Sequence, residues 1–132
     1  MQIRFKHIQF LELETNVTTL DKDVTSELET TLNVDNTFSS ESKTEFTINF
    51  YIKIENKDKS FYLKLKAIAQ FNTKENIEDE FKTSPFILIN APAIAFPYVR
   101  TFISNLTLNM GYNPILLPTF NFVELSKNNE KK

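Results

Sequence analysis

The sequence contains no cysteine and only one glycine, Gly111. Without cysteine the chain can form no disulfide, thiolate nucleophile or sulfur-ligated zinc site, which fits a reducing compartment. The scarcity of glycine argues against phosphate-binding loops and against tight Asn-Gly hairpin turns. No apolar run approaches the roughly 18 to 20 residues of a membrane span, and residues 1–10 lack the sections of a signal peptide. We therefore expect a cytoplasmic protein that does not insert into a membrane.

Charges of both signs are interspersed along the chain. Fifteen basic and 17 acidic residues give a net charge of −2, so there is no basic footprint for nucleic acid. His7 is the single histidine, and no cysteine can join it in a catalytic or zinc site. Glu12 and Glu14 could act as paired carboxylates, but two acids at this spacing more often form an ordinary polar edge. The acidic residues 78–80 lack the pattern of a calcium loop. The sequence predicts no enzyme, no metal site and no cofactor.

Phenylalanine is abundant, with 13 residues in a chain of 132. A dense core accounts for many of them, and the alternative is a surface with aromatic pockets for apolar segments of other proteins. A chain of this length forms one domain. We assign residues 1–125 to that domain and residues 126–132 to a polar, flexible tail.

Alternation of apolar and polar residues predicts four β-strands. The clearest is Phe46–Ile54, and Phe61–Phe71 follows it after a polar turn, which indicates an antiparallel hairpin. Glu27–Phe38 alternates in the same way. The first segment, Gln2–Glu14, changes phase along its length, as a bulged strand or a strand buried on both faces at an interface would.

One long helix is predicted after these strands. It begins at Pro97, or at Pro92 with a kink at Pro97. Gly111 then offers a left-handed cap, and Pro114 prevents the helix from resuming. The apolar stripe that carries this prediction has helical spacing and consists of Val99, Phe102, Ile103, Leu106 and Met110.

Three further segments connect these elements. Residues 72–81 read as an acidic, solvated connection, and residues 82–90 as a short strand or a segment lying on the sheet. Residues 116–122 read as an extended pass across apolar surface, followed by a short turn. The order of elements indicates an α+β fold, a four-stranded antiparallel sheet packed with one long C-terminal helix. Because one helix cannot cover such a sheet, we expect self-association through the helix and the first strand.

Peptide recognition by a surface groove requires apolar pockets beside irregular main chain. Aromatic residues that flank the helix and the extended segment meet this description, although each of them also suits a core position. The candidates for the pocket walls are Phe86, Phe96, Tyr98, Phe120 and Phe122.

Two motifs in residues 90–125 resemble a known signature. The first is FPYVR, with Phe96, Pro97, Tyr98 and Arg100, and the second is LLPTFNF, with Leu116, Pro118, Asn121 and Phe122. Together they resemble the bacterial protein-export chaperone SecB and its SecB-like relatives. The resemblance is specific over roughly the last third of the chain.

The resemblance implies a dimer of dimers in which helices lie between outer sheets. It also implies a function, which is to hold newly made polypeptides unfolded along apolar grooves and to pass them to the translocase motor SecA without using nucleotide. The family contacts the motor through acidic residues on the sheet face, and Glu12 and Glu14 match such positions. Lys64 stands where another acid is usual, Thr101 stands where an acid usually follows the FPYxR motif, and the family's long C-terminal helix is expected to be shortened or missing.

The function expected from these observations is that of an ATP-independent holdase, a cytoplasmic homotetramer that keeps unfolded preproteins competent for export or folding. Two alternatives remain open at this stage. One is a SecB-like chaperone dedicated to a single client such as an antitoxin, and the other is an assembly protein with the same fold and no chaperone activity.

Overall fold

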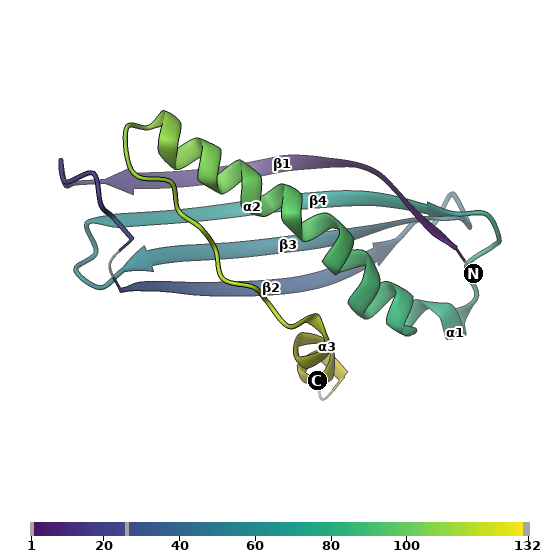
Figure 1. Ribbon diagram of the computed structural model, residues 1–132. Coiled ribbons are helices and arrows are strands. Elements are labelled where there is room, and N and C mark those ends of the chain that lie inside the picture. The colour runs from purple at the N-terminus through teal and green to yellow at the C-terminus, as the bar shows by residue number, and fades with distance from the viewer. Residues whose placement is uncertain (1, 26, 131–132) are drawn as a thin grey trace.

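The computed structural model describes residues 2–25 and 27–130 and shows one antiparallel sheet with helices packed on it (Figure 1). The strands are β1 (Ile3–Val17), β2 (Leu28–Phe38), β3 (Glu45–Asn56) and β4 (Phe61–Thr73), and their order in the sheet is β1-β4-β3-β2. Strands β3 and β4 form the expected hairpin. The predicted α+β fold is confirmed.

Two bulges explain the change of phase in β1. The pairing of β1 with β4 shifts between Phe5 and His7 and again between Phe10 and Glu12. Each bulge moves the following side chains to the other face of the sheet. The strand also runs beyond its predicted end at Glu14, because pairing with β4 continues to Val17.

The core lies on the face of the sheet that α2 (Ala91–Asn109) crosses. Alternate side chains of β3 and β4 point to this face, and the others point to the opposite face, as the period of two requires. Each of the inward side chains of these two strands is at most 4% exposed. They are Phe46, Ile48, Phe50, Ile52, Ile54, Phe61, Leu63, Leu65, Ala67, Ala69 and Phe71.

The helical region begins at Asp79, well before the apolar stripe that starts at Val99. A short helix α1 (Asp79–Lys82) and one π-helical turn (Phe86–Asn90) precede α2, where the sequence predicted a solvated connection and then a short strand or a segment lying on the sheet. The backbone N–H groups of Ile87 and Leu88 both donate to the carbonyl of Ser84, and the Ile87 side chain is fully buried. Burial of this apolar run against the core therefore favours a helical path over a strand.

Helix α2 follows the longer of the two predicted courses. Pro92 is its second residue and Pro97 lies further inside it, and neither has an N–H to donate to the preceding turn. The helix ends at the predicted glycine, since Gly111 has a φ of 97°. The N–H of Tyr112 donates to the carbonyl of Thr107 at 3.1 Å, which closes a left-handed C-terminal cap.

After this cap, residues 112–121 return across the same face of the sheet without regular structure (Figure 1). We call this segment the strap, and it confirms the expected extended pass. Helix α3 (Phe122–Glu130) follows, where a short turn and a flexible tail were expected. The Asn121 side-chain oxygen caps α3 by accepting from the N–H groups of Val123 and Glu124 at 3.0 and 3.2 Å. Residues 131–132 lie outside the described residues.

The helical stretch Asp79–Asn109, 31 residues long, meets the length and composition of a membrane span, although its sequence holds no uninterrupted apolar run. Its apolar residues have a packing role. Ala91, Ala95, Val99 and Ile103 are fully buried against the rest of the protein. Buried core helices of soluble proteins have the same length and composition, so these two properties are weak evidence for a membrane span.

Candidate functional site

A groove with a volume of about 600 Å³ lies between the strap and the beginning of β2. Strand β2 is one edge of the sheet, so the groove is open along a strand that has a neighbour on one side only. The lining combines three residues before and within β2 with six of the strap. They are Thr25, Leu28, Thr30, Asn113, Pro114, Ile115, Leu116, Leu117 and Pro118.

The strap presents its side chains alternately to the core and to the groove. Ile115 and Leu117 are 0% and 6% exposed, whereas Leu116 between them is 78% exposed. An extended backbone produces this alternation, and the prolines at 114 and 118 favour the extended form. An exposed leucine is thus held beside an edge strand.

Side chains of α2 hold the strap in place at Ile115. The Ser104 hydroxyl donates to the Ile115 carbonyl at 2.5 Å, and the Ile115 N–H donates to the Thr107 hydroxyl at 3.0 Å. Thr107 is only 1% exposed, so its hydroxyl satisfies a buried backbone donor. Further along, the Arg100 guanidinium donates to the Pro118 carbonyl at 3.4 Å and lies 5.8 Å from the centre of the Phe96 ring.

We expect Thr107→Val to lower the free energy of unfolding by about 1 to 3 kcal/mol, because it leaves the buried N–H of Ile115 without an acceptor at nearly constant side-chain volume. Urea unfolding followed by circular dichroism measures the change. Thr101→Val is the matched control, since Thr101 is an exposed residue of the same helix. Equal losses in the two variants would show that helix propensity, and not the contact with the strap, sets the effect.

The strap is also tied to the loop between β1 and β2. The Asn113 N–H donates to the Lys22 carbonyl at 2.9 Å, and the Tyr112 hydroxyl donates to the Thr19 carbonyl at 2.6 Å. Within the loop, the Asp23 carboxylate accepts hydrogen bonds from the hydroxyl and N–H of Thr25, which lowers the pKa of Asp23. These bonds hold the loop against the first residues of the strap.

Three of the five aromatic candidates form one cluster, which joins α2, the strap and α3. The Phe96 ring lies 5.2 Å from the Phe120 ring and 5.8 Å from the Phe122 ring, and it also approaches Phe50 of β3 at 6.0 Å. Phe96 and Phe122 are 3% and 9% exposed, and Phe120 is half-buried. This cluster joins the strap and α3 to the core.

The other two candidates lie apart from that cluster and from each other. Phe86 is 40% exposed and stacks on Phe81 at 5.8 Å, whereas Tyr98 is 50% exposed and stacks on Phe5 of β1 at 4.8 Å. Within the described residues, none of the five candidates lines the groove beside β2. Their part in client binding stays a prediction.

Sequence reasoning missed the aliphatic residues of the groove. It selected aromatic side chains on irregular segments, but the groove is formed by Leu28, Leu116 and the prolines of the strap. The alternation of Ile115, Leu116 and Leu117 becomes informative only once the strap is known to cross a buried surface.

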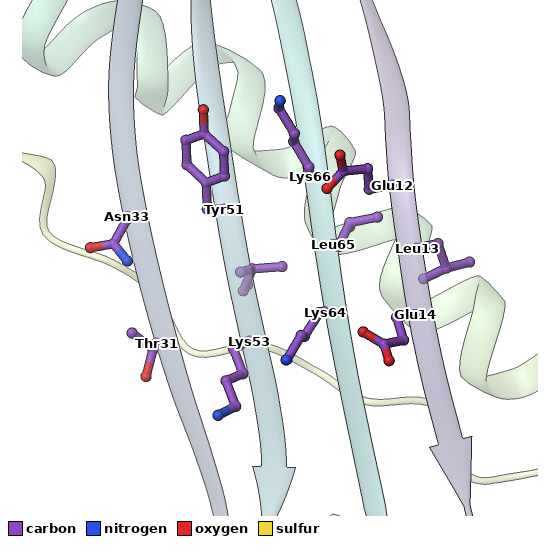
Figure 2. A pocket seen from close by; sticks show the side chains of 11 residues that line it. Glu12, Leu13, Glu14, Thr31, Asn33, Tyr51, Lys53, Lys64, Leu65 and Lys66 are labelled. Carbon is purple, nitrogen blue, oxygen red and sulfur yellow. The ribbon is translucent and has the colours of Figure 1, made fainter.

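Glu12 and Glu14 lie on the opposite face of the sheet. Both point outward from β1, and together with lysines of β3 and β4 they line a hollow of about 400 Å³ (Figure 2). The Tyr62 hydroxyl donates to a Glu14 carboxylate oxygen at 2.7 Å, and this bond raises the pKa of Tyr62. His7 is exposed on β1 opposite Gln70. Among the described residues, no three acidic or histidine side chains are placed to hold a metal ion.

Sequence comparison finds SecB export proteins and an uncharacterized protein as relatives. A protein-export protein SecB of Roseobacter denitrificans is 32% identical over 95 residues, which cover 71% of this chain and 54% of the relative. An uncharacterized protein of Methanocaldococcus jannaschii is 31% identical over 130 residues, which cover 96% of this chain and 80% of the relative. The chain spans about half the length of the export proteins that it matches.

Among solved structures, the SecB-like chaperone of Mycobacterium tuberculosis, in complex with a peptide from the HigA1 antitoxin, superposes with a TM-score of 0.73. The superposition covers 89% of this chain and 90% of that chain at 14% identity, so it shows a shared fold. The model of the family described as preprotein translocase subunit SecB matches residues 2–132. Because that match extends over almost the whole sequence, the chain belongs to the SecB family.

Proposed function

We propose that this protein is an ATP-independent holdase, which binds unfolded polypeptides or preproteins and keeps them competent for export or folding. The groove between β2 and the strap is the observation that carries the proposal, because it holds Leu116 at 78% exposure within a SecB-family chain. An exposed apolar groove of this kind marks an interaction site.

The groove suits an extended, apolar client segment. Leu28 and Leu116 offer contact to apolar side chains, and the open side of the edge strand leaves room for the client's main chain. Binding of this type spreads its free energy over many weak contacts and needs no catalytic group. Capture and release of different unfolded chains then require no nucleotide.

A chaperone dedicated to one client is the second candidate function. The superposition with a SecB-like chaperone bound to an antitoxin peptide favours it, since the two chains share their fold over about nine-tenths of their length. An assembly protein without chaperone activity is the remaining alternative. Promiscuity toward unfolded proteins distinguishes these three functions.

We further propose that the protein acts in the cytoplasm as a homotetramer, a dimer of dimers formed through α2 and β1. Strand β1 is the second edge of the sheet, and exposed apolar side chains lie along it and along α2. Such surfaces favour association with a second copy. The exposed residues are Leu11, Leu13, Ile94, Tyr98 and Leu108.

Contact with a translocase motor such as SecA is a finer proposal. Glu12 and Glu14 are exposed on an open sheet face and are the candidate residues for it. Lys64 and Lys66 stand opposite these two acids in the register and would repel a basic partner. Exchange of both acids for glutamine should reduce motor binding if this contact exists.

Size-exclusion chromatography with light scattering tests the main proposal. The free protein is run alone, with a chemically unfolded and reduced client, and with the same client in its native form. A tetramer that binds only the unfolded client supports a general holdase. A folded oligomer that binds none of several unfolded proteins would contradict it and favour a dedicated client or an assembly role.

A further inference from the structure

The outer face of the sheet, opposite α2 and the strap, carries no described helix and has charges of both signs at its centre (Figures 1 and 2). In the strand register, Lys64 of β4 stands between Glu14 of β1 and Lys53 of β3. Two residues further along β4, Lys66 stands between Glu12 and Tyr51. The centre of the face therefore changes from acidic on β1 to basic at three lysines of β4 and β3, with Glu55 two residues beyond Lys53 on β3.

Lys53 and Lys64 form a cross-strand pair of like charge, an arrangement that weakens a sheet. The ion pairs described for residues 2–25 and 27–127 do not include Lys53, Lys64 or Lys66. Tyrosine rings hold two of these amines on the face instead. The Lys64 amine lies 5.9 Å from the centre of the Tyr62 ring, and the Lys66 amine lies 5.6 Å from that of Tyr51.

We propose that this face docks an acidic segment of a partner protein, whose carboxylates bind Lys53, Lys64 and Lys66. Neighbouring strands lie about 4.8 Å apart, and alternate residues along a strand lie about 6.7 Å apart. Two acidic side chains separated by one residue in an extended segment therefore reach two lysines together. Tyr51, 37% exposed, adds an apolar contact beside Lys66.

The neighbouring acids select a peptide over a nucleic acid. Glu12 and Glu14 border the lysines on β1, and Asp35 and Glu55 occupy the same face on β2 and β3. A phosphate backbone, with a negative charge at every residue, meets repulsion from these carboxylates. A peptide can place acidic residues over β3 and β4 and neutral or basic residues over β1.

This surface is separate from the groove beside β2, so the proposal goes beyond the chaperone function. Glu12 and Glu14 alone would attract a basic partner, whereas this proposal requires an acidic one. Electrostatic docking of this type governs specificity and the rate of encounter, and it weakens as salt is added.

The test uses the full chain labelled with ¹⁵N and two synthetic peptides, one of six glutamate-serine repeats and one of six glutamine-serine repeats, at low salt. We expect the acidic peptide to shift the amide signals around Lys53, Lys64 and Lys66 and the neutral peptide to leave them in place. In the triple variant K53Q/K64Q/K66Q the affinity should fall by about tenfold, the sum of three surface ion pairs.

The triple variant K43Q/K74Q/K127Q is the matched control, because it removes the same charge at three exposed lysines elsewhere. Equal loss of affinity in both triple variants would overturn the proposal, and so would equal binding of the two peptides. Tighter binding of a single-stranded oligonucleotide through the same lysines would also overturn it. Capture of unfolded client should be unchanged in both variants, which separates this result from the outcome for the groove.

Discussion

Exchange of Leu116 for glutamate is expected to weaken capture of an unfolded client by about tenfold or more. Leu116 is 78% exposed, so its side chain contributes little to the fold, but it is one of the residues that line the groove. Contact of a leucine side chain with apolar client surface contributes about 1.5 to 3 kcal/mol, which corresponds to about 10- to 150-fold in affinity. A carboxylate in its place must also be desolvated when the client binds.

The measurement is a titration of fluorescently labelled, reduced and unfolded client, with urea unfolding of the variant measured in parallel. Leu20→Glu is the matched control, because Leu20 is 97% exposed and lies outside the groove lining. Equal affinity for client in Leu116→Glu and the unchanged protein would remove the groove from the client-binding surface. Equal losses in both variants would indicate a general effect of added negative charge.

Exchange of Phe96 for alanine is expected to lower the free energy of unfolding by about 3 to 5 kcal/mol. Phe96 is 3% exposed and joins four parts of the molecule, since its ring neighbours lie on β3, the strap and α3 and it is itself part of α2. Its loss leaves a cavity and also removes the surface on which the Arg100 guanidinium rests. Urea unfolding at constant protein concentration measures the change.

Phe86→Ala and Tyr98→Ala are the matched comparisons, because each removes an aromatic ring that is 40% or 50% exposed. We expect both to cost less than about 2 kcal/mol, in proportion to the area that they bury. If Phe96→Ala proved no more destabilising than these two, Phe96 would not be a core residue. The same variants assign Tyr98, since a loss of client capture would place it on a client-binding surface and a smaller oligomer would place it at the interface between copies.

The strands and the end of α2 could be predicted because local patterns determine them. The unbroken alternation in Phe46–Ile54 and Phe61–Phe71 fits one arrangement, a pair of strands with one buried face. Gly111 and Pro114 determine the end of the helix in a similar way, because a positive φ and a missing N–H are properties of single residues. Even the bulges of β1 are visible as a change of phase.

The helical turns before Ala91 and helix α3 were harder to predict. The run from Phe86 to Asn90 has the composition of a strand, and only the burial of Ile87 against the core shows why it turns instead. In α3, the polar residues after Leu125 gave no helical signal. This helix is stabilised by the cap from Asn121, which precedes it, and by the packing of Phe122 on Phe96 of α2.

The sequence by itself determined the α+β fold, the order of its elements and the motifs of the SecB family, because alternation, helix caps and motifs depend on neighbours along the chain. Only the tertiary structure decided which apolar residues face solvent. Phe96 and Leu116 are both apolar residues of the two family motifs, yet one is buried by three other segments and the other is left in an open groove. That difference arises because exposure depends on which distant segments pack over a side chain.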